Sequence, residues 1–360
     1  MRFPARSDGR GRRCVPARAQ GDIAPEDQVR KEASRSQNDI AGAAGGLRAL
    51  ARRELQEFAA HPPAVPDEGE WSRRVTLLVK TFERPRCASR VVCSIRRHFP
   101  RVEVLVCDDS REPLFEDGAQ PLPGVTWLTL DFDRGHTLGA GRNYLVDRTP
   151  TPFFFLLDDD HVVTAGTRLA DMLDFLEGHG YDIVGGAQGR EEYGAAVFEQ
   201  DGDGVRQVFH RHHGEVAPGV VRCDRVSNTF MARTEAVQRV RWEERVYANE
   251  HADFFLRASR AGLLIAQMGG TWVDHDRRCE QAAGLWGRLL GDLLPHKDGH
   301  YRFLRLGGDG QTRAAARRAR ELYRRYVLEK NGVRDIVDVD RARDRRALLR
   351  LIGPPDPARR

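Results

Sequence analysis

The chain has 360 residues, 40% of them hydrophobic, so it can bury the core of one large α/β domain or of two ordinary domains. The formal net charge is +5, but residues 1–35 carry +4, residues 311–360 carry +8 and the middle carries −7. An acidic centre argues against a nucleic-acid-binding surface and suits a site for a divalent cation. No apolar run approaches the roughly 18 residues of a membrane span, and no secretory signal is visible, so we expect a cytoplasmic protein without a transmembrane segment. The alternative is a Golgi or membrane-associated protein, if the N-terminus is incomplete.

The predicted elements follow one another in three sections. We expect residues 1–70 to be a disordered, basic extension with a short helix at 47–60, residues 71–290 to be an α/β domain, and residues 291–360 to be a helical, Arg-rich extension. The six cysteines form no C-x-x-C pair, which excludes a zinc ribbon and favours free, buried thiols.

Strands and helices alternate regularly within the second section. Short apolar runs predict buried strands, and amphipathic segments between them predict helices. The strands are expected at 75–80, 102–107, 125–130, 152–157 and 181–184, and the helices at 85–98, 141–147 and 169–178. Further along, the pattern predicts a hairpin at 197–209, strands at 220–231 and 263–268, and helices at 249–261 and 313–330. This order predicts a mostly parallel, Rossmann-like sheet flanked by helices.

Acidic residues follow most of the predicted strands. In an α/β sheet, ligands bind beyond the carboxyl ends of the strands, and carboxylates crowded there repel one another unless a cation or hydrogen-bond donors hold them. The segments at these ends are Thr81–Arg84, Asp108–Ser110, Asp131–Asp133 and Asp158–His161.

The run Asp158-Asp159-Asp160 is the sharpest signal. If the chain stays extended, Asp158 and Asp160 point to one side and Asp159 to the other. Two carboxylates on one side, directly after a buried strand, suit Mg²⁺ or Mn²⁺ bridging a diphosphate. A solvated acidic turn is the alternative, and the buried strand before the run argues against it.

The ordered motifs resemble those of the family 2 glycosyltransferases, and most closely their β-1,4-N-acetylgalactosaminyltransferase (family 12) branch. The resemblance covers about residues 75–275 and rests on VTLLVKTFERP, VLVCDDS, GAGRN, FLLDDDH, DIVGGA, VSNTFMART, EHADFFLR and VDH, in that order. It implies that residues 71–290 are a GT-A glycosyltransferase domain that uses a UDP-sugar donor and a divalent metal and inverts the anomeric carbon. It also implies a glycan or glycoconjugate acceptor, with N-acetylgalactosamine as the favoured donor sugar.

The resemblance also assigns roles to individual residues. It makes Asp158 and Asp160 the metal ligands, with His275 as a further ligand. The residues that it places around the UDP-sugar are Thr81, Phe82, Arg84, Asp108, Asp109, Asp159 and Asn228, with Arg142 and Asn143 at a helix start that suits a diphosphate. Without the resemblance, an Asx turn is the alternative for Asp108 to Ser110, and a lone histidine is more often structural.

Transfer needs a general base for the acceptor hydroxyl. In the family this carboxylate starts a helix in an acidic-aromatic motif, which Asp253 matches better than Glu250. His251 could orient either carboxylate. Both acids could instead complement the helix dipole.

The chain departs from the family pattern in some places. His161 replaces an aromatic residue, the family's membrane anchor is missing, and residues 279–310, which should help form the acceptor site, match no motif. A sugar-nucleotide pyrophosphorylase is an alternative function, but the loop after the first strand lacks the glycines that such an enzyme needs. A non-catalytic carbohydrate- or nucleotide-binding protein is the other alternative, although the acids that it would have lost are present.

Overall fold

The computed structural model describes residues 45–62, 68–131, 134, 136–190, 192–246, 249–276 and 310–353, with side chains in the last range from 321 onward. The chain divides into two units after Ala44, and every described residue belongs to the second. The unmatched stretch, residues 279–310, therefore lies outside the described residues except for its last residue, and residues 132 and 133 also lie outside them. No helix in the described ranges is long and apolar enough to cross a membrane.

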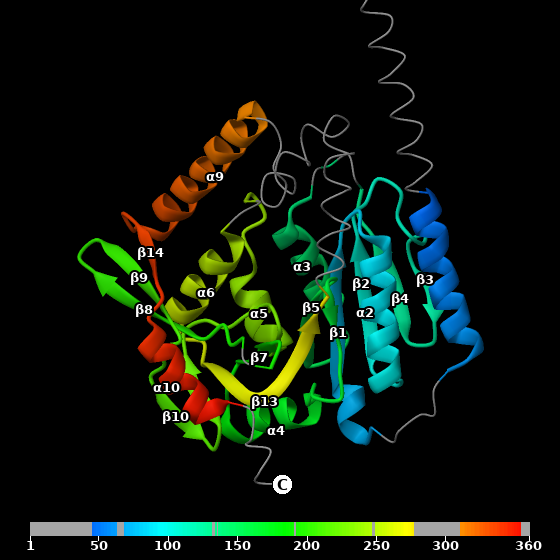
Figure 1. Ribbon diagram of the computed structural model, residues 1–360, viewed down its shortest axis with the longest axis horizontal. Coiled ribbons are helices and arrows are strands. Elements are labelled where there is room, and N and C mark those ends of the chain that lie inside the picture. Colours follow the sequence, from blue (N-terminus) through cyan, green and yellow to red (C-terminus); the bar gives the residue numbers. More distant parts are fainter. Residues whose placement is uncertain are drawn as a thin grey trace, which may run out of the picture. The chain divides into compact units, whose positions relative to one another are not determined.

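Four parallel strands form the core of a large mixed sheet (Figure 1). In spatial order they are β4 (Val125–Thr129), β2 (Glu103–Asp108), β1 (Val75–Thr81) and β5 (Phe153–Asp158). The register pairs Thr81 with Asp108 and Lys80 with Asp158, so the carboxyl ends of β1, β2 and β5 meet at one edge. The strand ends that the sequence predicts to form a site are therefore brought together.

Antiparallel strands extend this core on both sides. Beyond β5 lie β12 (Phe230–Arg233), β7 (Ile183–Gln188), β13 (Ile265–His275), β11 (Val220–Cys223) and β10 (Gly214–Ala217); β3 (Ala119–Leu122) lies beyond β4, and β6 (His161–Val162) pairs with β13. Only β7 and β13 are parallel in this part. The α/β class is confirmed, while parallel pairing is concentrated in the core. The stretch predicted as one strand at 220–231 is two short strands, β11 and β12, at different places in the sheet.

Helices cover both faces of the sheet. One face carries α2 (Pro85–His98), α4 (Leu169–His179) and the helix at 45–60; the other carries α3 (Leu138–Asp147), α5 (Thr234–Val240), α6 (Glu250–Arg260) and α10 (Ala342–Ile352). Strand β5 supplies both cores because its side chains alternate: Phe153, Phe155 and Leu157 join the first cluster, and Phe154 and Leu156 the second. A fully apolar strand is what burial on both faces requires.

A second, three-stranded sheet contains the predicted hairpin. It comprises β8 (Ala196–Asp201), β9 (Gly204–Phe209) and β14 (Ile336–Val339), with the DGDG turn between the first two. The parallel strand β14 comes from the C-terminal part of the chain, and the sequence patterns did not predict it. They also did not predict β3, the short helix η1 (Glu70–Arg74) or α10.

The C-terminal segment contacts the body of the molecule at three places. Helix α9 (Gly310–Asn331) packs on α6, β14 pairs with β9, and α10 packs on β13. At the end of α10, the backbone lies directly against Gly269, where a Cβ would come within 2.0 Å of the Ile352 carbonyl oxygen. Tyr193 donates a hydrogen bond of 2.9 Å to the same oxygen. The segment is thus part of the fold wherever it is described.

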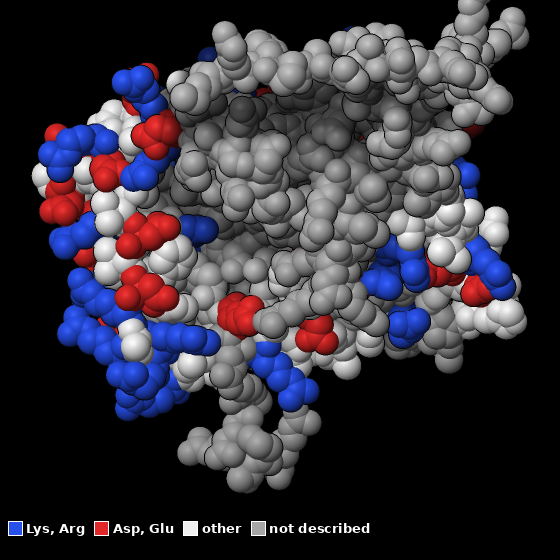
Figure 2. Space-filling model, turned by 45° about the horizontal axis from the view of Figure 1, so that its top comes forward, with Lys and Arg blue, Asp and Glu red and all other residues white. Residues whose placement is uncertain are grey.

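Ion pairs and thiols add local detail. On the face drawn in Figure 2, described Lys and Arg side chains lie beside Asp and Glu side chains. Exposed pairs such as Arg334–Asp203, at 3.0 Å, each contribute about 0–1 kcal/mol, so the buried clusters dominate stability.

Three of the cysteines are free, as expected: Cys93, Cys107 and Cys223. Cys87 is disulfide-bonded, which corrects the expectation of free thiols for this residue.

Candidate active site

Asp158 is the last residue of β5 and the most accessible acid of the Asp158–Asp160 run, with 27% of its side chain exposed. Its Oδ1 accepts a hydrogen bond of 3.0 Å from the guanidinium of Arg142, and its Oδ2 accepts one of 3.3 Å from the Asn228 amide. The family resemblance places Asn228 near the donor sugar, and the structure places it beside this carboxylate. Asp158 therefore has a defined orientation and a partly open side.

Asp160 lies in the turn after β5, next to His275 and Arg84. Its Oδ2 is 3.4 Å from His275 Nε2 and 2.9 Å from the Arg84 guanidinium. Burial alone would raise the pKa of Asp160, but the hydrogen bond from His275 and the charge of Arg84 outweigh it and hold that pKa below its ordinary value. Asp160 is therefore a carboxylate at neutral pH, as a metal ligand must be.

Asp159 contacts Thr81, which Asp160 does not, and shares Arg84 with Asp160. Thr81 donates a hydrogen bond of 2.8 Å to its Oδ2, and Arg84 donates one of 2.7 Å to its Oδ1. Burial raises the pKa of Asp159 to about 6, although the Arg84 charge opposes the shift. Because Asp159 and Asp160 lie in a turn, the divergence comes from the turn rather than from an extended strand. Arg84 contacts both Asp159 and Asp160. Phe82, two residues before Arg84 in the chain, is buried.

Asp158 and Asp160 fit a divalent cation. One ligand atom from each of Asp158, Asp160 and His161 lies within 4.8 Å of the others. His161 is nevertheless a poor ligand, because its Nδ1 accepts a hydrogen bond of 3.1 Å from the Asp158 backbone N–H. Its Nε2 lies 3.0 Å from the Gln188 side-chain amide, so this ring nitrogen has a neighbour as well. Carboxylate oxygens suit a hard cation such as Mg²⁺ or Mn²⁺.

Asp108 and Asp109 differ in what they contact. Asp108 accepts from the backbone N–H groups of Ser110, at 3.0 Å, and Leu114, at 2.9 Å, and from the indole of Trp127, at 3.2 Å. It holds the loop after β2, as the Asx-turn alternative predicted. Asp109 is buried and paired with Lys80, and it does not hold this loop. Of the two residues, Asp109 is therefore the better candidate for binding the base of a nucleotide.

The GAGRN segment is explained by packing rather than by a phosphate cradle. Helix α3 begins at Leu138, with Thr137 as its N-cap, so Arg142 and Asn143 lie inside the helix instead of opening it. A Cβ on Gly141 would come within 2.2 Å of the Lys80 side chain, so glycine leaves room for that lysine. This start three residues earlier corrects the predicted helix boundary.

Arg142 and Asn143 are both buried and already engaged. Arg142 is fully buried and bridges Asp158 to Glu250, whose Oε1 is 3.4 Å from the guanidinium. The Asn143 amide donates to the Trp242 carbonyl at 3.0 Å and accepts from the Trp242 N–H at 2.9 Å. The structure therefore does not place either residue at a helix N-terminus that could receive a diphosphate.

Glu250 and Asp253 both lie in the first turns of α6 but face different neighbours. Glu250 joins the Asp158 side through Arg142 and keeps 12% of its side chain exposed. Asp253 is fully buried and is held by Arg257, Lys330 and Asn331. The neighbouring His251 donates from Nε2 to the Val226 carbonyl at 2.8 Å, and burial keeps its pKa well below the ordinary value. It orients neither acid.

Lys80 is a site residue that the sequence analysis passed over. Its Nζ donates to the Thr81 carbonyl at 2.7 Å and pairs with Asp109, with the side chain almost completely buried. The available signal was a lysine closing the apolar run VTLLV, in a chain with only four lysines. A buried lysine must be paired, which directs attention to an acid at the neighbouring strand end.

Comparison with known proteins agrees with this geometry. Residues 76–241 match the model of glycosyl transferase family 2. The chain is 35% identical over 228 residues to human beta-1,4 N-acetylgalactosaminyltransferase 1, and 30% identical over 210 residues to mouse beta-1,4 N-acetylgalactosaminyltransferase 2. These matches cover 59% and 57% of this chain but only 41% and 39% of the relatives' own lengths.

A structural overlay is weaker than the sequence matches. The crystal structure of S. aureus TarS is 18% identical, with a TM-score of 0.41 over 63% of this chain and 42% of that one. The family match includes β1, β2, β5 and the Asp158–Asp160 turn, and it ends before α6 begins. Residues 76–241 thus resemble glycosyl transferase family 2, and the α/β sheet that these residues form agrees with the fold class that the motifs predicted.

Proposed function

We propose that this chain transfers a sugar from a UDP-sugar to a hydroxyl group of a glycan or glycoconjugate, with inversion at the anomeric carbon. One observation carries the proposal: Arg142 links Asp158, at 3.0 Å, to Glu250, at 3.4 Å. A candidate metal ligand, Asp158, and a candidate general base, Glu250, thus lie on either side of the buried Arg142 guanidinium. Identity to two N-acetylgalactosaminyltransferases supports N-acetylgalactosamine as the donor sugar.

Asp158 and Asp160 would hold the divalent cation, Mn²⁺ or Mg²⁺, with His275 beside Asp160 as a further ligand. When bound, such a cation offsets the negative charge of the leaving diphosphate. Arg84 would contribute a positive charge at the same edge, because it already contacts both Asp159 and Asp160. The buried Asp109 would accept a hydrogen bond from the uracil N3–H, and Thr81 and Phe82 would line the same pocket.

We assign the general base to Glu250 rather than to Asp253. The acceptor hydroxyl gives its proton to Glu250, its oxygen forms the new bond to the anomeric carbon, and the bond from that carbon to the UDP oxygen breaks. Glu250 is suited to this role because its carboxylate is partly exposed and directed toward the Asp158 side. Both oxygens of Asp253 are occupied by Arg257, Lys330 and Asn331.

A donor and acceptor screen tests the proposal. Purified protein is mixed with UDP-N-acetylgalactosamine and other UDP-sugars, with a panel of glycan acceptors, in Mn²⁺ or in EDTA. Mass spectrometry detects transfer and donor hydrolysis, and NMR of the product determines the anomeric configuration. We expect metal-dependent transfer with a β-linked product. Binding of UDP without hydrolysis or transfer from any donor would instead support the non-catalytic binding protein.

The compartment is a separate question. A cytoplasmic location stays a prediction, and the disulfide at Cys87 argues against it, since disulfides persist mainly in oxidising compartments. Fractionation of cells that express the tagged chain, with mass spectrometry of Cys87 under non-reducing conditions, measures both properties together.

A further inference from the structure

The helix that carries Glu250 has an unusual beginning. Among the described residues no side chain caps α6, and its N-cap residue, Asn249, has a left-handed backbone with φ 64°. The first backbone N–H groups of a helix normally receive a side-chain acceptor, and the loss of such a cap costs about 1 kcal/mol. Something other than a cap must therefore hold the first turn of α6.

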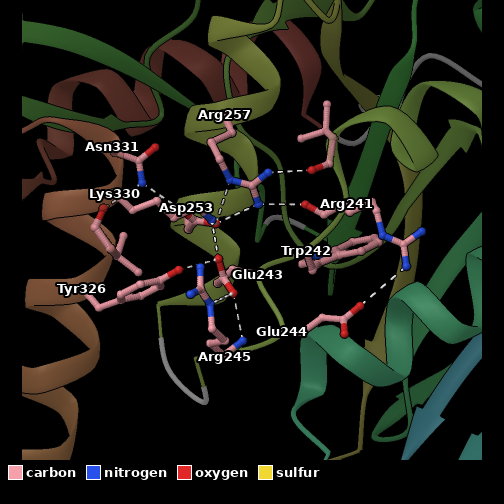
Figure 3. A network of polar contacts seen from close by, with 12 residues as sticks. Arg241, Trp242, Glu243, Glu244, Arg245, Asp253, Arg257, Tyr326, Lys330 and Asn331 are labelled. Atoms are coloured by element: carbon pink, nitrogen blue, oxygen red, sulfur yellow. Dashed lines mark hydrogen bonds and ion pairs between the residues drawn. The ribbon is translucent and has the colours of Figure 1, made fainter.

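The end of α9 contacts this turn directly (Figure 3). Asn331 Nδ2 donates to Asp253 Oδ1 at 2.8 Å, and Lys330 Nζ lies 3.3 Å from Asp253 Oδ2. Arg257, one turn further along α6, also pairs with Asp253 at 2.8 Å and donates to the carbonyls of Val240 and Arg241. Because Asp253 is completely buried, its charge needs these partners.

The same end of α9 also holds the segment between α5 and α6. Glu243 Oε2 accepts from Lys330 Nζ at 2.7 Å and from the Tyr326 hydroxyl at 2.9 Å. Burial would raise the pKa of Glu243, but the hydrogen bonds, led by that from Lys330, lower it to about 2. Trp242, next to Glu243 in the chain, contacts the side-chain amide of Asn143 on α3. Lys330 therefore contacts α6 through Asp253, and it is linked to α3 indirectly, through Glu243 and Trp242.

We propose that Tyr326, Lys330 and Asn331, here called the α9 clamp, are positioning residues for catalysis. This inference rests on the proposed function, in which Glu250 is the base. Glu250 lies on α6, and its partner Arg142 lies on α3, at a distance of 3.4 Å that leaves little room for displacement. By fixing both elements, the α9 clamp holds the carboxylate where an acceptor hydroxyl can reach it. The family match ends at residue 241 and does not include any of these contacts.

Kinetics of Lys330→Met test the inference. The variant keeps the aliphatic stem and removes the charge between Glu243 and Asp253. A displaced catalytic group costs up to about 100-fold, so we expect kcat for transfer to fall by about 10- to 100-fold, with KM for the UDP-sugar within about twofold. Lys330→Arg should recover most of kcat. The matched control is Arg325→Met, since Arg325 is on the same helix in an exposed pair with Glu329.

Hydrogen exchange provides a readout that does not depend on activity. Lys330→Met should speed amide exchange at residues 250–254 and leave α4 unchanged. A kcat within twofold of wild type, an equal loss of donor affinity and kcat, or faster exchange throughout the molecule would each overturn the inference. If the wild type transfers no sugar, the proposed function fails, and exchange still decides whether the α9 clamp holds α6.

Discussion

The edge of the parallel strands and the contact between α6 and α9 both gather charged side chains, but they use them differently. At the edge, Asp158 keeps 27% of its side chain exposed, although Arg142 and Asn228 each contact one of its oxygens. At the α6–α9 contact, Asp253 has no exposure, and its oxygens contact Arg257, Lys330 and Asn331. A carboxylate with an accessible side can bind a ligand or accept a proton, whereas a completely buried and paired one holds helices together.

The largest effect should follow from removing the acids of the edge. Asp158→Asn and Asp160→Asn should each reduce metal-dependent transfer by more than about 10³-fold, because each loses a charged ligand oxygen. Asp159→Asn should be milder, since its carboxylate contacts Thr81 and Arg84 instead. Initial rates against Mn²⁺ concentration measure all three. Equal losses in the three variants would contradict the assignment of the metal site.

The next prediction separates the two acids of α6. Glu250→Gln should lower kcat by about 10²–10⁴-fold, the usual cost of losing a general base, with an unchanged unfolding temperature. Asp253→Asn should lower the unfolding temperature, because it removes the buried counter-charge of Arg257 and one of the two carboxylates that Lys330 contacts. Calorimetry and steady-state kinetics on both variants make the comparison. Near-normal turnover of Glu250→Gln, with a correctly folded but inactive Asp253→Asn, would reverse the roles.

A smaller effect concerns the nucleotide. Asp109→Asn should weaken UDP binding by about 1–3 kcal/mol, the range for losing a buried or charged hydrogen bond. Lys80→Met should have a similar effect, because Lys80 pairs with Asp109. Isothermal titration with UDP measures both, and Asp117→Asn, on an exposed loop, is the control. Unchanged affinity in both variants would move the uracil pocket away from this edge.

The smallest effect is a pH dependence of stability. Because the pKa of Glu243 is lowered to about 2 in the folded chain, its contribution to stability is present above its unfolded pKa of about 4.3. That contribution is lost as the pH falls from about 4.3 toward 2. Urea unfolding of wild type and Glu243→Gln should therefore differ most at neutral pH and converge in acid. A constant difference across that range would show that Glu243 does not contribute through its charge.

The sequence was sufficient to predict the edge of the sheet but not the α6–α9 contact. A buried strand such as FFFLLD can be recognised in the sequence by its apolar run. The alternation of strands and helices then predicts that Asp158 and Asp109 lie at one edge of the sheet. Local patterns could not rank Glu250 above Asp253, because the ranking depends on Lys330 and Asn331, almost 80 residues away. For the same reason β14 was missed, since it forms only by pairing with the distant strand β9.

The contact between Gly269 and Ile352 has a consequence for the history of this chain. Any side chain at position 269 would meet the Ile352 carbonyl at 2.0 Å, so α10 can be seated only while residue 269 is glycine. Relatives with a larger residue at 269 should therefore lack α10 or seat it elsewhere, whereas glycine at 269 is compatible with either arrangement.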